Sequence, residues 1–453
     1  MNGESRALTT GSVVKGMLLF AVPIFMSNLF QQLYNAVDSL IVGNFIGGEA
    51  LAAVGSSGSL IFLLTGFVNG VSLGAGVLIA RHFGAGDDAA LHRTVHTTIA
   101  LGLAAGAVLT VVGVAFTPQI LRWMGTPDNV IGNSILYFRI YFMGSIAVVL
   151  YNVGASILQS VGDSRSPMFY LIAASLLNVV LDLVFIAGFG MGVGSVAFAT
   201  ILSQALSAFL AFRKLGRARG AWAVRWRDVR FDLPTLRAVV AQGVPSGVQN
   251  SVISLANVVV QANINSFGAD AVAGCAAYSK VEGFAFLPVT CFAMALATFV
   301  SQNIGAGQLG RVRSGMRFGI VTSAALAEGI GVAIFALAPL LIGVFSGEAA
   351  VIAFGVRQAR TASLFYCLLA FSHCCAGILR GLGRPVVPMA IMLAVWCALR
   401  IAYITVTLRF IPVIQVIFWA YPLTWAISSV LFARYLLHCP LPVPGGGAPG
   451  HSE

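Results

Sequence analysis

The sequence predicts an all-α integral membrane protein of twelve transmembrane helices in two six-helix lobes. Three observations predict this fold: an apolar composition, a series of long apolar segments and an internal repeat. Hydrophobic residues make up 58% of the 453 residues, and charged residues only 9%. Since a soluble domain carries roughly 25% charged residues to face water, most of this exterior must face lipid.

Twelve apolar segments are long enough to cross a bilayer, which takes about 20 residues of helix. The predicted spans are 17–42, 53–80, 94–116, 134–158, 167–187, 193–213, 238–263, 272–300, 315–345, 354–379, 386–409 and 414–437. The first run is too long for the apolar part of a signal peptide, so we expect it to remain as the first span.

Short motifs recur along the chain at a constant offset of 221 residues. FGAG (83–86) matches IGAG (304–307), IGGEALA (46–52) matches FGADAVA (267–273), and LQSVGDSRSPM (158–168) matches LRGLGRPVVPM (379–389). Each half has six predicted helices, and an even number returns the chain to its starting side. We therefore expect parallel repeats related by a pseudo-two-fold axis along the membrane normal, as in alternating-access transporters.

The positive charge of the chain lies mainly in loops beside apolar segments. The net charge is +11, and its densest part follows the sixth span: Arg213, Lys214, Arg217, Arg219, Arg225, Arg227, Arg230 and Arg237. A basic loop between spans is the signal that sets orientation, so it predicts two cytoplasmic termini and no nucleic-acid partner. We expect a multi-pass protein of the plasma (inner) membrane, surrounded by lipid and acting as a monomer.

The predicted domains follow the repeat. They are an N-lobe (1–212), a basic cytoplasmic linker (213–237), a C-lobe (238–437) and a disordered cytoplasmic tail (438–453) rich in Pro and Gly. Most of the seven cysteines lie inside apolar runs, where a thiol behaves as a small hydrophobe, and their spacing predicts neither a disulfide framework nor a metal site.

Ionisable residues inside the spans are functional candidates, because a charge in the bilayer costs about 2.5–3.5 kcal/mol on insertion scales. Asp38 in the first span belongs to a helical stripe at i, i+3, i+4 and i+7 with Gln31, Tyr34 and Asn35. The same span contains Pro23, which we interpret either as a hinge or as a static kink.

A second acid stands in the fifth span. Asp182 follows Asn178 by one helical turn, and helix rise places Asp38, Asp182 and Thr200 in the outer half of the first lobe. Two buried carboxylates disfavour each other's charge, so one of them can hold a proton, and the same oxygens with Asn178 and Thr200 suit Na⁺. The open alternative is that each Asp only fixes helix packing.

The second half has weaker candidates. They are Lys280, Glu282, Glu328, Arg357, Arg360, His373 and Arg400. We interpret Glu282 as a contact for substrate, Lys280 as a side chain that snorkels outward, and Glu328 as either a coupling group or a structural acid.

Enzyme motifs are missing from the sequence. It has no Walker A, HExxH or GxSxG pattern, which predicts a secondary active transporter with no cofactor besides its coupling ion. A membrane-embedded enzyme would need a cluster of His, Asp or Ser, and none is evident. A flippase for lipid-linked oligosaccharides would need a cationic cavity, whereas the first half offers only Arg139 near a span edge.

Several stretches resemble the MATE family of multidrug and toxic compound extrusion transporters. They are QQLYNAVDSLIVGNFIGGEALAAVG (31–55), the GAG after the second span, LQSVGDSRSP (158–167) and NVVLDLVFIAGFGMGVGSVAFAT (178–200). The similarity covers about 15–437 and looks like the DinF-type or a related bacterial branch.

The resemblance implies a V-shaped pair of lobes that exports organic cations in exchange for H⁺ or Na⁺. It places the coupling cation at Asp38, Asn178, Asp182 and Thr200, with Gln31 and Tyr34 lining the pocket; no other metal is implied. NorM-type members carry an acid on the seventh and on the tenth helix, and both are missing here. We therefore expect coupling in the N-lobe, with Glu282 as a substrate contact.

Overall fold

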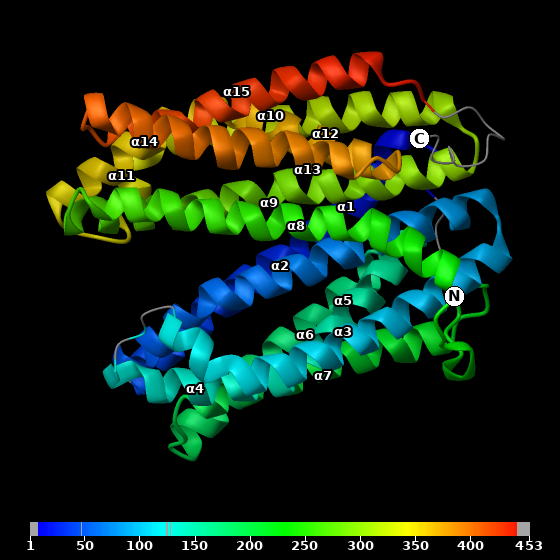
Figure 1. The fold of residues 1–453 in the computed structure, drawn as a ribbon, viewed down its shortest axis with the longest axis horizontal. Helices are drawn as coiled ribbons and strands as arrows, with labels where there is room; N and C mark the ends of the chain where they lie inside the picture. Colours follow the sequence, from blue (N-terminus) through cyan, green and yellow to red (C-terminus); the bar gives the residue numbers. More distant parts are fainter. Residues whose placement is uncertain (1–7, 47, 124–125, 127, 442–453) are drawn as a thin grey trace. The chain divides into compact units, whose positions relative to one another are not determined.

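The computed structural model describes residues 8–46, 48–123, 126 and 128–441. Within this part of the chain, all regular structure is helical, as predicted (Figure 1). The elements up to the linker are α1 (Val13–Phe45), α2 (Gly48–Ala85), α3 (Asp88–Trp123), α4 (Asp128–Met143), α5 (Ser145–Ser160), α6 (Arg165–Asp182), the π-helical η1 (Leu183–Gly188) and α7 (Gly194–Gly216).

The linker contains a short 3₁₀ helix, η2 (Trp226–Asp228). The elements after it are α8 (Leu233–Asn265), α9 (Ala269–Gly305), α10 (Leu309–Gly343), α11 (Ala349–Ala362), the 3₁₀ turn η3 (Ser363–Phe365), α12 (Tyr366–Gly381), α13 (Val386–Met392), the π-helical η4 (Leu393–Leu399), α14 (Arg400–Phe410) and α15 (Gln415–His438). The predicted tail from 442 onward lies outside the described residues.

Each of the twelve predicted spans corresponds to one helix or to consecutive helical pieces. Among the described residues, nine helices are long and apolar enough to cross a membrane, and α4 with α5 makes a tenth if that pair, bent by 48°, is one span. The helix α8 is not among them, because it carries several amides: Gln249, Asn250, Asn257, Gln261 and Asn263.

The sequence repeat is also a repeat of backbone geometry. Gly86 and Gly307 follow α2 and α9 with φ of 66° and 69°. Gly162 and Gly383 follow α5 and α12 with φ of 91° and 83°. Glycine adopts this left-handed conformation without steric cost, so it ends a helix and turns the chain at equivalent points of both halves.

Aspartates begin several helices. Asp87 accepts the N–H of Ala90 at the start of α3 (2.9 Å), and Asp232 accepts the N–H of Thr235 at the start of α8 (3.1 Å). The Thr235 hydroxyl also donates to Asp232, and these bonds lower the pKa of that carboxyl. A carboxylate at this position satisfies free N–H groups and complements the helix dipole.

The described chain divides into two compact units, and α1 and α8 are shared between them. The first unit contains Val22–Val244, and the second contains Leu8–Ala21 and the chain from Pro245 onward. Each shared helix changes unit beside an internal proline, Pro23 in α1 and Pro245 in α8. A proline removes one backbone hydrogen bond, so it weakens the helix at the crossing point.

Within the first unit, α5 packs against α3 and α7 around a core that includes Val95, Val153 and Ile157. The start of α8 approaches α2 very closely, because a Cβ on Gly74 would lie 2.2 Å from the Cα of Gly243. Such glycine contacts hold membrane helices together by backbone packing.

Within the second unit, α9 contacts α10, α11 and α12 (Figure 1). The segment before α1 is fastened to this unit by polar contacts. Leu8 donates its N–H to Gln302 (2.8 Å), and the Arg311 guanidinium donates to the carbonyl of Gly11 (2.6 Å). The first residues of α1 therefore belong to the second unit through specific bonds.

Apolar side chains are also exposed along the helices. Val108 and Val111 on α3, Leu176 on α6 and Phe209 on α7 are among the exposed large hydrophobic residues. An exterior of this kind is expected of helices that face lipid.

Candidate functional site

The two acids predicted in the first half lie together inside the first unit. Their carboxyl groups, from α1 and from the last residue of α6, lie close to each other. Asp182 is fully buried, and Asp38 is partly buried. The helix continues past Asp182 as the π-helical η1, a distortion that is frequent at functional sites.

The polar atoms around these acids are short of partners. Among the described residues, no hydrogen bond reaches the buried Oδ1 of Asp38, either carboxyl oxygen of Asp182 or the side-chain amide of Asn178. The buried hydroxyls of Ser175 and Ser203 also have no hydrogen-bond partner among the described residues. A buried polar atom without a partner costs about 1–3 kcal/mol, so this cluster favours a proton, a cation or water.

A small cavity adjoins the cluster, and its volume is about 10 Å³. Its lining residues come from α1, α6 and α7: Tyr34, Leu171, Ala174, Ser175, Asn178, Thr200, Ser203 and Gln204. That volume holds about one water-sized particle. Thr200 donates its hydroxyl proton to the carbonyl of Val196 (3.0 Å), so its oxygen keeps lone pairs for another ligand.

Tyrosines enclose the carboxyl pair. Tyr34 lies near both acids and beside Gln31, and Tyr137 on α4 lies near Asp38 and Tyr34. The Tyr137 ring stacks on Tyr141 at a centroid distance of 6.4 Å. The site therefore combines acidic oxygens with aromatic side chains, and its cavity has the size of a small cation or a water molecule.

Two other residues of α1 were also singled out from the sequence. Asn35 is exposed, and its carbonyl accepts the hydroxyl of Ser39 (2.9 Å). Pro23 is buried where α1 changes unit, and its carbonyl accepts the hydroxyl of Ser27 (2.9 Å). Back-bonding by serine slightly destabilises and bends a helix, which adds to the effect of the proline.

The donor set of the site matches a hard monovalent cation or a proton. Carboxylate, amide and hydroxyl oxygens are the ligands that such cations prefer. Alternatively, a proton placed on one carboxyl group gives the pair a donor that it lacks. Both readings use Asp38, Asn178, Asp182 and Thr200, the residues singled out from the sequence.

In the second unit, Glu282 is the centre of another polar group. Its carboxylate accepts the hydroxyl of Tyr278 (3.0 Å), which lies 2.9 Å from the hydroxyl of Tyr366. Arg400 interacts with Glu282 through charge, and it donates to Thr424 Oγ1 from Nη2 (2.7 Å). Glu282 thus has partners of its own, unlike the acids of the first unit.

The other candidates of the second half are distributed over its surface and core. Glu328 accepts the backbone N–H of Cys367 (3.1 Å) at the break between η3 and α12, as a structural acid does. Lys280, Arg357 and Arg360 are exposed.

His373 lies between the rings of Phe286 and Trp396, at centroid distances of 4.9 and 5.3 Å. A lone histidine in an apolar span is usually a core residue with satisfied nitrogens, but Nε2 of His373 has no partner among the described residues.

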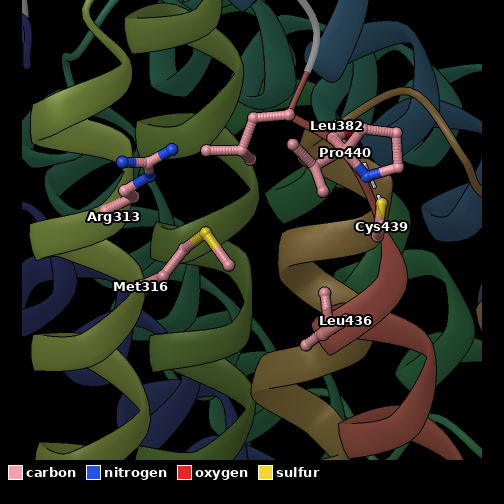
Figure 2. Close-up of a pocket in the computed structure, with 7 residues that line it drawn as sticks. Arg313, Met316, Leu382, Leu436, Cys439 and Pro440 are labelled. Carbon is pink, nitrogen blue, oxygen red and sulfur yellow. Dashed lines mark hydrogen bonds between the residues drawn. The ribbon is translucent and has the colours of Figure 1, made fainter.

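A larger hollow of about 310 Å³ lies in the second unit, near the ends of α12 and α15 (Figure 2). It is lined by Arg313, Met316, Leu382, Leu436, Cys439, Pro440 and Leu441. None of the candidate residues from the sequence lines it, so size alone does not identify the site.

Several lining residues were missed from the sequence. Ser203 and Gln204 continue a stripe from Thr200 at i+3 and i+4, and Ser175 precedes Asn178 by three residues. This helical spacing was available, but small polar residues are common in membrane helices, and their hydroxyls usually bond to their own backbone.

Duplicated helical units, long apolar helices and a buried carboxyl pair together define a multi-pass secondary transporter. Comparison with known proteins gives the family. Its profile, described as MatE, matches residues 23–184 and again 245–406. The chain belongs to this family, the MATE transporters, which are multi-pass proteins of the plasma membrane and not enzymes.

Individual relatives cover most of the chain. The "Probable multidrug resistance protein YoeA" of Bacillus subtilis is 30% identical over 94% of this chain and 93% of the relative. The "FAD transporter" of Shewanella oneidensis is 25% identical over 69% of this chain and 70% of the relative. A solved structure described as an outward-facing multidrug resistance MATE family transporter shares the fold, with a TM-score of 0.89, 21% identity and coverage of 97% and 98%.

Proposed function

We propose that the chain is an antiporter that exports organic cations in exchange for inward movement of H⁺ or Na⁺. The observation that carries this proposal is the carboxyl pair of Asp38 and Asp182, whose buried oxygens lack partners within the described first unit. A binding site left short of hydrogen-bond donors stabilises an added proton or cation more than any neutral occupant.

The two cargoes compete for one negative charge. With the pair loaded by H⁺ or Na⁺, the site has no net charge to offer an organic cation. With the pair empty, its negative charge attracts such a cation, and Tyr34 and Tyr137 are aromatic side chains close to it. Competition of this kind makes the uptake of one cation the condition for release of the other, which is antiport.

Pro23 supplies the hinge in this proposal. The part of α1 before it belongs to the second unit, and the part after it carries Asp38 in the first. A change of the bend at Pro23 therefore moves Asp38 relative to Asp182 and Asn178 on α6. Loading of the site and the conformation of α1 become linked, since the occupied and empty pairs favour different positions.

The rival function is flipping of a lipid-linked oligosaccharide. A pyrophosphate needs cationic partners, but Arg139 is exposed on α4. The first-unit site has acids instead, and this polarity favours a cationic cargo. Because a relative is named for FAD, an anion, the charge of the cargo must be tested directly.

The test is efflux from proteoliposomes driven by one gradient at a time. A pH gradient alone or a Na⁺ gradient alone should drive transport of a permanent lipophilic cation such as tetraphenylphosphonium. Asp38→Asn and Asp182→Asn should each abolish the driven component. Transport of the cation that is independent of both gradients, or unchanged in both variants, would remove the proposal.

A further inference from the structure

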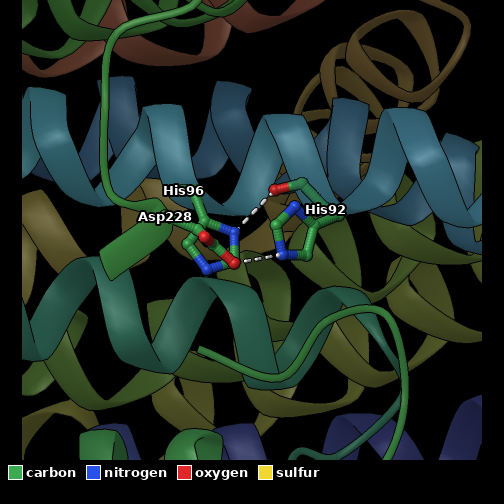
Figure 3. Close-up of side chains that lie close together, drawn as sticks. All are labelled: His92, His96 and Asp228. Atoms are coloured by element: carbon green, nitrogen blue, oxygen red, sulfur yellow. Dashed lines mark hydrogen bonds and ion pairs between the residues drawn. The ribbon is translucent and has the colours of Figure 1, made fainter. Parts of the chain in front are cut away.

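A second polar cluster joins α3 to the linker (Figure 3). His92 and His96 stand one turn apart on α3, with ring centroids 4.0 Å apart. Asp228, from η2 in the linker, places its carboxylate 3.3 Å from Nε2 of His92. One ligand atom from each of the three side chains lies within 4.8 Å of the others.

The linker is held against α3 by its backbone, so the position of Asp228 is well defined. The N–H of Arg225 donates to Nε2 of His96 (3.0 Å), and the N–H of Asp232 donates to Oγ1 of Thr97 (3.4 Å). Trp222 and Val224 are buried in the same core as Leu91 and Val95. The carboxylate is therefore brought to the histidines by packing on both sides of η2.

The hydrogen bonds of His96 determine which nitrogen can bind a metal. Because Nε2 accepts the Arg225 N–H, the ring proton is on Nδ1, which donates to the carbonyl of His92 (2.8 Å). A bond from the second ring nitrogen to a backbone carbonyl is the usual support of a metal-binding histidine. Nε2 of His96 thus carries the lone pair of the ring, which accepts the Arg225 N–H in this structure.

The distances match a tetrahedral metal site. With metal–ligand bonds of about 2.0–2.2 Å, neighbouring ligand atoms of a tetrahedron are about 3.3–3.6 Å apart. The His92–Asp228 pair is already at 3.3 Å, and the third ligand atom needs to close by little more than an ångström. Both side chains are partly exposed, at 34% and 40%, so an ion reaches them from solvent.

We propose that His92, His96 and Asp228 form a binding site for a divalent transition metal of the Zn²⁺ class, which fastens the linker to α3. Two imidazoles and one carboxylate select such a metal over Mg²⁺ or Ca²⁺, which prefer oxygen ligands alone. Water completes the tetrahedron. Binding replaces the Arg225 N–H at Nε2 of His96, so affinity is moderate rather than that of a preformed site.

The surrounding charge does not prevent binding. Arg225, Arg227 and Arg230 of the linker are exposed, and their repulsion of a cation is screened by water and salt. Without metal, the same side chains fasten the linker through the His92–Asp228 contact and the bond from the Arg225 N–H to His96. A metal site and a metal-free contact differ in one respect: only the metal site binds an added ion and becomes more firmly fastened to the linker.

The experiment is a titration of the purified full-length chain, without a polyhistidine tag, with Co²⁺ and then Zn²⁺. We expect the visible absorption of tetrahedral Co²⁺, one ion per chain, and displacement by Zn²⁺. His92→Ala and Asp228→Asn should weaken binding at least about tenfold, since removal of supporting residues alone costs 10–100-fold. His438→Ala, at an exposed histidine on α15, is the matched control and should bind as the wild type does.

Two further readouts do not depend on the stability of the alanine variant. Asp228→Cys should tighten Zn²⁺ binding and add a sulfur-to-cobalt absorption band, because thiolate is a stronger ligand. Zn²⁺ should also slow tryptic cleavage after Arg227 in the wild type and not in Asp228→Asn. Absence of the cobalt band, equal binding by His92→Ala, or cleavage that Zn²⁺ does not change would each overturn the proposal.

Discussion

Replacement of Asp38 by Asn tests coupling quantitatively. In the proposed exchange, the neighbouring carboxyls of Asp38 and Asp182 together carry one exchangeable proton or one Na⁺. At zero membrane potential, a gradient of one pH unit supplies about 1.4 kcal/mol per proton. That energy concentrates a monovalent organic cation about tenfold against its own gradient.

The assay measures the steady ratio of tetraphenylphosphonium across proteoliposome membranes, with the potential clamped by K⁺ and valinomycin. Wild type should reach a ratio of about ten per pH unit, or per tenfold Na⁺ gradient if Na⁺ is the coupling ion. Asp38→Asn should stay near one, because an amide neither takes a proton nor neutralises Na⁺. Ser39→Ala, which loses only a bond to the exposed carbonyl of Asn35, should match the wild type. A tenfold ratio in Asp38→Asn would refute the reasoning.

Three further changes have distinct expected results. Pro23→Ala should slow transport about tenfold in initial-rate assays with little change in the binding constant for the cargo, because it restores a helical hydrogen bond at the hinge; an unchanged rate would contradict a hinge role. Gly74→Leu should lower the melting temperature or abolish folding, since even a Cβ lies 2.2 Å from Gly243, whereas a normal melting curve would show that α2 and α8 are not in this contact. Glu328→Ala should destabilise by about 1–3 kcal/mol through the lost bond to Cys367 yet keep gradient-driven transport, and loss of coupling in a folded variant would show a second coupling site.

Hydropathy and the repeat predicted much of the fold, because lipid imposes a simple rule on span length. The rule concerns the length and polarity of a span and does not predict the pitch of its helix. The π-helical segments after Asp182 and before Arg400 were therefore not predicted. The bend between α4 and α5 was missed for the same reason, since the two helices together are long and apolar enough for one span.

The sequence also did not predict that α1 and α8 each begin in one unit and continue in the other. Each half was assigned a continuous segment, but Leu8–Ala21 packs with the second unit and the start of α8 with the first. Hydrophobic pattern reports how much of a helix faces lipid and not which neighbour it contacts. Pro23 and Pro245 lie at these crossing points, but their presence in the sequence did not predict that the helices change unit there.

The residues of the candidate site could be predicted where their type is rare in a membrane span, and could not be predicted where it is common. An aspartate in a membrane span is costly, so Asp38 and Asp182 were conspicuous, and the structure brings them together. Asn35 belongs to the same helical stripe yet is exposed, because a stripe on a long helix is wider than the contact it makes. The cluster of His92, His96 and Asp228 depends on how the linker folds, which its basic composition did not indicate.

The most direct test is proton or sodium release on binding of cargo. Tetraphenylphosphonium should be added to the purified protein in weakly buffered detergent solution, once with a pH indicator and once with radioactive Na⁺ bound beforehand. Competition for one acidic pair predicts release of about one H⁺ or one Na⁺ per organic cation bound, and none from Asp182→Asn. Binding of the organic cation with no release of either ion from the wild type would show that the two cargoes do not compete at Asp38 and Asp182.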